Sequence, residues 1–221
     1  MSIVKYTGNG SSSATVGHGL NAQLKMLIHK RLDDVGSWKI KHTSLSTNHQ
    51  LLFDTAASVD VTGNHGGGMA DLSSSSTFGF AQGLTNVDNV NGNGPSYINI
   101  CFSEIPGFSA FGSYTGNGSS DGVYVHTGFR PALVLQKRSD SAGHEWSIHD
   151  STREPSNDVG LYLEPSTSNA EQDGNRRDFL SNGFKIRTSS PGVNASGGTY
   201  IYAAWAEAPT VDLYGGGANA R

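Results

Sequence analysis

Tyr6-Thr7-Gly8-Asn9-Gly10-Ser11-Ser12 occurs a second time in this 221-residue sequence, as Tyr114-Thr115-Gly116-Asn117-Gly118-Ser119-Ser120. Seven consecutive identities indicate two copies of one unit, because a repeat of this length rarely arises by chance. We therefore predict two tandem units, residues 1–110 and 111–221. Glycine and asparagine readily adopt positive φ, so the Gly-Asn-Gly centre of each copy predicts a hairpin-type turn at the start of each unit.

The composition indicates an all-β fold. The chain has 29 glycines, and only 15% of its residues are charged. Helical proteins are instead rich in Ala, Leu and charged residues. The composition suits many short strands joined by Gly, Ser and Asn turns, and we predict antiparallel sheets.

Charge and cysteine content limit the partners and cofactors. The formal net charge is −4 and no basic stripe is present, which argues against nucleic acid as the main partner. Cys101 is the one cysteine, so we expect neither an intrachain disulfide nor zinc held by a cysteine pair. The N-terminal residues lack a signal-peptide pattern, and no run of about 18 apolar residues occurs, so we predict no membrane insertion.

Two tryptophans repeat at the same separation as the opening stretch. Trp38 and Trp146 are each followed two residues later by isoleucine. Because side chains alternate across a strand, Trp38 and Ile40 should share one face, and Lys39 and Lys41 the other. The pattern predicts strands with one packed and one solvated face, in which each tryptophan anchors the core.

The repeat decides an ambiguity between helix and strand. Leucines between residues 20 and 35 fall at helical spacing, but the matching segment of the second unit opens with Pro131 and is short, as strands are. Copies of one unit should share one structure, so we predict strands at residues 25–31 and 132–138. Each ends in a basic pair, which we interpret as a solvated strand end: Lys30-Arg31 and Lys137-Arg138.

Each unit closes with a long apolar strand, predicted at residues 97–105 and 200–208. On the first of these, Ile98, Ile100 and Phe102 alternate with the less apolar set Tyr97, Asn99 and Cys101. We predict that the isoleucine and phenylalanine face is the core face. The unmatched middles of the two units, residues 55–77 and 165–177, are predicted to be polar surface loops in which the units could differ in function.

No catalytic signature is present, and we expect a protein that is not an enzyme and needs no cofactor. Glu104 and Glu207 repeat in both units, which favours a structural role over acid–base catalysis, because two full active sites are rarely kept side by side. His18 and His126 also repeat. They are either ligands or residues that orient a turn, and we favour the turn.

Two groups of residues are candidates for binding. Residues 86–93 carry oxygen donors at alternating positions, as calcium prefers, but they lack the EF-hand spacing, so we interpret them as turns and predict no metal site. Aromatic rings can stack on sugars, and the candidate ligand-contact residues are Tyr124, Tyr162, Tyr202 and Tyr214.

Over nearly its whole length the chain resembles uncharacterised tandem modules found in virion proteins of tailed bacteriophages. The unit 1 residues that carry this resemblance are 6–11, 16–20 and Trp38. Those of unit 2 are residues 111–118, 128–132, 137–138, 180–185 and 200–209. Unit 1 departs from the pattern at residues 21–24, where unit 2 has Pro131.

The resemblance implies two tandem antiparallel β-sandwich units of jelly-roll or lectin-like type in a virion protein. It implies a role on the particle surface, as a tail-fibre or receptor-binding module that contacts host surface glycan. The alternatives are a capsid head-decoration protein and, more weakly, a glycan-degrading enzyme. The implied partners are other virion proteins, host glycan and further copies of the chain, with a trimer as one option. The family carries no known catalytic residues to transfer.

Overall fold

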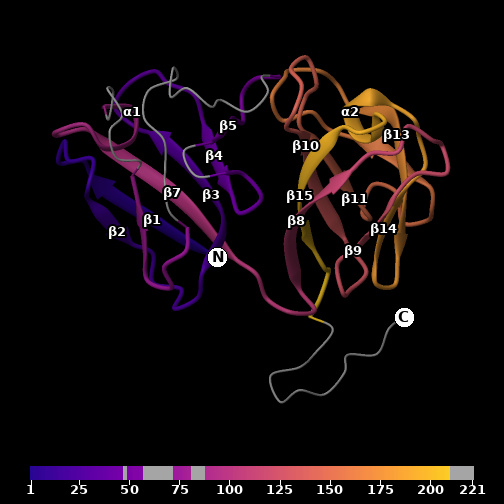
Figure 1. Cartoon of the computed structure of the whole chain (residues 1–221), viewed down its shortest axis with the longest axis horizontal. Coiled ribbons are helices and arrows are strands. Elements are labelled where there is room, and N and C mark those ends of the chain that lie inside the picture. The colour runs from indigo at the N-terminus through magenta and orange to yellow at the C-terminus, as the bar shows by residue number, and fades with distance from the viewer. Residues whose placement is uncertain (47–48, 57–71, 81–87, 210–221) are drawn as a thin grey trace. The chain divides into compact units, whose positions relative to one another are not determined.

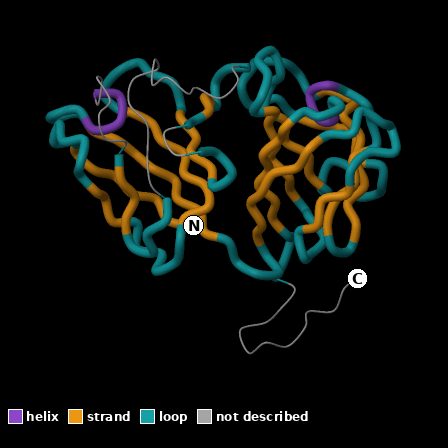
Figure 2. Tube along the Cα trace, viewed as in Figure 1, coloured by secondary structure: helices purple, strands orange, loops and turns teal. Residues whose placement is uncertain are grey.

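The computed structural model describes residues 1–46, 49–56, 72–80 and 88–209. The chain is all-β with antiparallel sheets, as predicted, and two single-turn helices accompany the strands among these residues (Figure 2). It divides into two compact units, Met1–Glu104 and Ile105–Arg221.

The first unit is built on a five-stranded antiparallel sheet. In Figure 1, β7 lies between β1 and β3. The strands of this sheet, in spatial order, are β1 (Ser2–Thr7), β7 (Ser96–Ser103), β3 (Leu24–Arg31), β4 (Lys39–His42) and β5 (Leu51–Leu52). A second, two-stranded sheet pairs β2 (Thr15–Gly17) with β6 (Thr77–Gly79), and the short helix α1 spans Asp88–Asn91.

The second unit has two four-stranded antiparallel sheets. The first has the order β11 (Ser147–Asp150), β10 (Leu133–Arg138), β15 (Thr199–Trp205) and β8 (Ser109–Thr115). The second has the order β12 (Val159–Tyr162), β13 (Gln172–Leu180), β14 (Gly183–Ile186) and β9 (Tyr124–His126). The short helix α2 spans Pro191–Asn194.

Each unit has its own hydrophobic core. In the second unit both sheets contribute to one cluster: Val134 from β10 and Ala204 from β15 pack with Phe179 from β13 and Phe184 from β14. In the first unit, the core combines side chains from the large sheet with Phe78 from β6. Burial of this apolar surface is the main force that holds strands of two to nine residues together.

The repeat extends to sheet topology. Strands β1, β7, β3 and β4 have the same spatial order as β8, β15, β10 and β11. The strands predicted at residues 25–31, where a helix was the alternative, and at residues 132–138 are confirmed as β3 and β10. The closing strand pairs with the opening one in equivalent register, and the tyrosine rings stack 5.1 Å apart in Tyr6–Tyr97 and 4.9 Å apart in Tyr114–Tyr200.

The predicted hairpin at the Gly-Asn-Gly stretch is wrong. Strand β1 pairs with β7, and β2 pairs with β6, so the stretch crosses from one sheet to the other. Of its residues only Gly10 and its counterpart Gly118 have positive φ, 75° and 70°, whereas the asparagines between the glycines do not. The turn is a corner between sheets, held by contacts distant in sequence.

A buried asparagine from each short helix holds this corner. Asn194 Nδ2 donates to the Asn117 side-chain oxygen at 3.0 Å and to the Ser119 carbonyl at 2.7 Å. In the first unit, Asn91 Nδ2 makes the same two bonds to Asn9 and Ser11, at 2.8 and 2.7 Å. We call each arrangement the asparagine lock.

The closing strand β7 faces the opposite way from the prediction, whereas both faces of β15 are buried. Tyr97, Asn99 and Cys101 are buried on the inner face of β7, and Ile98 and Ile100 lie half-buried on the outer face. The physical reason is that hydrogen bonds engage the Tyr97 hydroxyl and the side-chain oxygen of Asn99. The Tyr97 hydroxyl, for example, accepts a bond of 2.9 Å from the backbone N–H of Gly92. A count of apolar residues therefore selects the wrong face.

The tryptophan strands also differ from the prediction. Each tryptophan directly precedes its strand, but Trp146 is 1% exposed, as expected of a core anchor, whereas Trp38 is 37% exposed. Lys39 and Lys41 are buried and not solvated. The Lys41 ammonium donates to the carbonyls of Ser46 and His49, at 2.6 and 2.9 Å, and these bonds offset part of the cost of burial.

The predicted loop at residues 165–177 is partly wrong, because β13 begins at Gln172 and runs through most of its second half. Its alternating polar sequence conceals a strand on which Arg177 points into the core. The loop predicted at residues 55–77 lies mainly outside the described residues.

Candidate functional site

Tyr124 is the predicted ligand-contact residue that the structure places on the surface. It lies on the edge strand β9 and is 45% exposed. Its hydroxyl donates to the side-chain oxygen of Asn182 at 2.8 Å and lies 3.3 Å from Nδ1 of His126. Asn182 belongs to the two-residue turn between β13 and β14, whose strands pair at Leu180 and Gly183.

Glycine at position 183 permits this arrangement. A Cβ at Gly183 would lie 2.1 Å from the Val125 carbonyl oxygen and 2.9 Å from the Tyr124 hydroxyl. The tyrosine side chain therefore lies flat against the neighbouring strand with its hydroxyl anchored. The ring of Tyr124 has its own hydroxyl, the Asn182 amide and the His126 imidazole at its rim. This arrangement suits a sugar, because an aromatic side chain offers an apolar face and a polar tip.

The other predicted tyrosines do not join Tyr124. Tyr162 is half-buried on β12, with its ring stacked on His149 at 5.2 Å, and burial raises the pKa of its hydroxyl. Strands β9 and β12 are opposite edges of one four-stranded sheet, so about 14 Å separates them. Tyr202 is 8% exposed and packs edge-to-face on Phe184 in the core, and Tyr214 lies outside the described residues.

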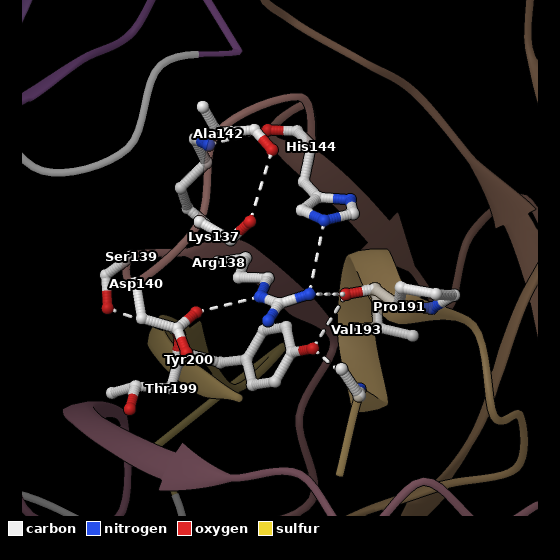
Figure 3. Close-up of polar contacts among 12 residues, drawn as sticks. Lys137, Arg138, Ser139, Asp140, Ala142, His144, Pro191, Val193, Thr199 and Tyr200 are labelled. Atoms are coloured by element: carbon white, nitrogen blue, oxygen red, sulfur yellow. Dashed lines mark hydrogen bonds and ion pairs between the residues drawn. The ribbon is translucent and has the colours of Figure 1, made fainter. Parts of the chain in front are cut away.

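A dense group of polar contacts surrounds Arg138 at the end of β10 (Figure 3). Its Nε donates to Asp140 at 2.7 Å, and Nη1 donates to the Pro191 carbonyl at 3.2 Å. Nη1 also lies 3.2 Å from Nε2 of His144, and the guanidinium carbon is 5.9 Å from the Tyr200 ring centroid. We call this group the Arg138 corner.

Electrostatics in the Arg138 corner follow from its ion pair. Burial alone would raise the pKa of Asp140, but the hydrogen bond from Arg138 dominates together with a backbone bond, and the pKa is lowered. Burial and the nearby positive charges lower the pKa of His144. Because Nε and Nη1 of the guanidinium already have partners, the Arg138 corner links β10 to α2.

The basic pair at this strand end is not the solvated feature predicted. Lys137 is fully buried, and its ammonium donates to the His144 carbonyl at 2.5 Å. The first unit repeats the ion pair, since Arg31 Nε donates to Asp33 at 2.8 Å. A geometry shared by the two units in this way indicates a structural role.

The repeated histidines differ in their surroundings, and both repeated glutamates are exposed. His18 is buried and its Nδ1 accepts from the Leu20 amide at 3.3 Å, as the turn-orienting interpretation predicts, whereas His126 is exposed beside Tyr124. Glu104 and Glu207 are exposed and belong to different strand ends, after β7 and β15.

The calcium interpretation is not favoured by the described part of residues 86–93. The Asn91 side chain is engaged in the asparagine lock. Within the described ranges, no group of three or more His, Cys, Asp or Glu side chains is placed to hold a metal ion. No helix among these residues is long and apolar enough to cross a membrane.

Sequence reasoning missed a polar group inside the second unit. Arg177 on β13, Gln136 on β10 and His149 on β11 are buried, and none of their side-chain nitrogens or oxygens has a hydrogen-bond partner among the described residues. We call these three residues the interior polar cluster. Alignment of the two units offers one signal, because polar residues recur at equivalent positions of these strands. Gln136 matches His29 and His149 matches Lys41, and His29 and Lys41 are also buried.

Comparison with known proteins places the chain in one family. Residues 1–209 match the family described as a domain of unknown function, DUF7483. No curated protein and no solved structure shows significant similarity to the chain. Because the match spans both units, the chain belongs to the DUF7483 family.

Proposed function

We propose that this protein is a non-enzymatic structural component of a bacteriophage virion, exposed on the particle surface as a tail-fibre or receptor-binding module. In this proposal the second unit contacts host surface glycan through Tyr124. The observation that carries the glycan contact is the exposed ring of Tyr124, anchored by Asn182 at 2.8 Å. The virion assignment rests on the sequence resemblance of the tandem units.

The proposed fold is a tandem pair of antiparallel β-sandwiches of jelly-roll or lectin-like type. The second unit supports it, since two four-stranded sheets share one core. A sandwich presents turns and edge strands on a rigid frame, which is where binding residues are commonly found. Tyr124 occupies such an edge position on β9.

The anchored hydroxyl matters for affinity. A free tyrosine loses side-chain entropy when it binds, whereas Tyr124 is already held by Asn182 and lies beside His126. The ring face remains available for stacking, and the imidazole and amide can bond to sugar hydroxyls.

An array of bacterial surface polysaccharides tests the glycan contact. We expect wild-type protein to bind a subset, Tyr124→Ala to lose at least tenfold in affinity, and Tyr124→Phe to retain the stacking but lose rim contacts. Tyr162→Ala, on the far edge of the same sheet, is the matched control and should bind normally. Equal binding by wild type and Tyr124→Ala would refute the contact.

Capsid decoration is the second candidate. Ile3 is exposed on the edge strand β1, and an apolar residue at a sheet edge favours contact with another protein. A map of the virion separates the candidates: density at the tail tip supports the receptor-binding role, and density on the capsid surface supports decoration. Sedimentation of the purified chain tests the proposed homo-oligomer, for which a trimer is one option, and a monomer would refute it.

A further inference from the structure

The second unit holds a positive charge in its interior, and no residue that the structure describes forms an ion pair with it. Arg177 is 0% exposed, and its three guanidinium nitrogens have no hydrogen-bond partner among the described residues. The guanidinium carbon lies 5.8 Å from the centroid of the Phe184 ring. Contact with an aromatic face recovers only a fraction of the cost of removing a guanidinium from water.

The carboxylates on β13 and at the end of β11 already form ion pairs with other arginines. Asp173 and Asp178, the acidic neighbours on β13, pair with Arg176 at 3.0 Å and with Arg187 at 2.5 Å. The carboxylate that ends β11, Asp150, pairs with Arg153 at 2.5 Å. These ion pairs leave Arg177 without an acidic partner from the strands that line its surroundings.

Two neutral donors lie on the facing sheet. His149 is directly opposite Val134, a core residue, and Gln136 follows Val134 by two positions, so all three side chains point inward. Burial, and then the charge of Arg177, lower the pKa of His149 well below its ordinary value, although the Asn175 backbone acts in the opposite direction, so the imidazole is neutral and carries one N–H. The amide of Gln136 supplies a further N–H group.

We propose that the interior polar cluster binds one small monovalent inorganic anion of the halide class, held by Arg177 and completed by N–H groups of Gln136 and His149. An anion supplies the missing charge and accepts the orphaned donors at once. Full burial of all three residues favours an ion of chloride size over phosphate or a sugar acid. This proposal does not depend on the glycan-binding role.

The first unit shows how such a position is satisfied without an anion. His29, which aligns with Gln136, lies 2.9 Å from the Asn99 side-chain oxygen through its Nδ1. Both residues are buried, and the imidazole Nδ1 of His29 and the side-chain oxygen of Asn99 are hydrogen-bond partners. The unpartnered Gln136 in the second unit is therefore a difference between two copies of one framework.

Thermal unfolding tests the proposal. In a Trp38→Phe background, Trp146 and Trp205 are the remaining tryptophans, and both report on the second unit. At constant ionic strength, replacing gluconate by chloride should raise the Tm of the fluorescence transition by roughly 5 °C at ten times Kd. Arg177→Met should abolish the rise. Arg187→Met, which removes a surface arginine, should keep it.

The opposite results would overturn the proposal. They are equal Tm values in chloride and gluconate, or a chloride effect that survives in Arg177→Met. Crystals soaked in bromide provide a direct and independent measurement. We expect one anomalous peak within hydrogen-bond distance of Arg177 and of Gln136 or His149. Bromide peaks confined to surface lysines and arginines, or a carboxylate of the chain paired with Arg177, would refute the site.

Discussion

Asn194 and Asn117 bond to each other twice across 77 residues of chain. Asn194 Nδ2 donates to the Asn117 side-chain oxygen at 3.0 Å, and its own Oδ1 accepts from the Asn117 backbone N–H, also at 3.0 Å. Asn91 and Asn9 repeat this reciprocal pair in the first unit. The most strongly repeated stretch of the sequence thus stabilises the join between the start and the end of each unit.

Loss of the asparagine lock should destabilise the unit that contains it. Asn194→Ala leaves the Ser119 and Thr188 carbonyls without their donors, and we expect the free energy of unfolding of the second unit to fall by about 2–4 kcal/mol. Denaturant titration followed by fluorescence in the Trp38→Phe background measures this. Asn169→Ala, at an exposed position, is the control and should change stability by less than about 0.5 kcal/mol.

The first glycine of each Gly-Asn-Gly stretch should not tolerate alanine. A Cβ at Gly116 would lie 2.3 Å from the Ala195 carbonyl oxygen, and one at Gly8 would lie 2.0 Å from that of Gly92. We expect each substitution to cost more than about 2 kcal/mol, because backbone must move. Gly36→Ala, which meets no atom within 4 Å, should fold normally in the same denaturation assay.

Stability of the second unit should rise with pH above 8. Burial lowers the pKa of Lys137 from 10.5 to about 8, so between these values the unfolded chain binds the proton and the folded unit does not. The free energy of unfolding should therefore increase by up to about 2 kcal/mol between pH 8 and pH 9.5. Above pH 10 it should fall again, because burial raises the pKa of Tyr114 in the folded state.

Lys137→Met separates this lysine from other titrating groups. The rise between pH 8 and 9.5 should disappear in the variant, whereas Lys185→Met, which changes a surface lysine paired with Asp121, should retain it. A pH profile of the Lys137→Met protein parallel to that of wild type would assign the titration elsewhere.

The two repeated tryptophans should differ sharply in their contribution to stability. Trp146→Ala empties a fully buried position and should cost about 3–5 kcal/mol. Trp38→Ala removes a partly exposed ring outside the strand ladder and should cost less than about 1 kcal/mol. Equal losses would contradict the environments described for the two rings.

Alignment of the repeat predicted the elements better than their faces. The choice of strand for β3 was correct because Pro131 in the matching segment excluded a helix, although the leucine spacing alone favoured one. The sequence predicts the wrong exposure for polar side chains that find hydrogen-bond partners in the interior of a unit. Tyr97 and Lys41 are buried because backbone groups bond to their hydroxyl and ammonium, and no local pattern in the sequence encodes those partners.

The candidate site was predicted incompletely. Composition identified exposed aromatic residues as candidates, but only the structure separates Tyr124 on the surface from Tyr202 in the core. The sequence predicts a loop around Arg177, because residues 165–177 form a long polar stretch. In the structure its neighbours Arg176 and Asp178 point the other way across the strand and form ion pairs. Alternation on β13 places one arginine of the pair in solvent and the next in the interior.

The pairing of the first and last strands of each unit, β1 with β7 and β8 with β15, has a consequence for how such units can be duplicated or inserted into other proteins. In the second unit Ser109 at the start of β8 lies opposite Trp205 at the end of β15, and Ser2 lies opposite Cys101 in the first. Directly opposed residues in an antiparallel pair have Cα atoms about 5 Å apart, so the polypeptide enters and leaves each unit at nearly one point. Such a unit can be copied or spliced into a surface loop of another protein as a cassette, because the host chain needs to open at a single peptide bond, with little displacement of the residues on either side.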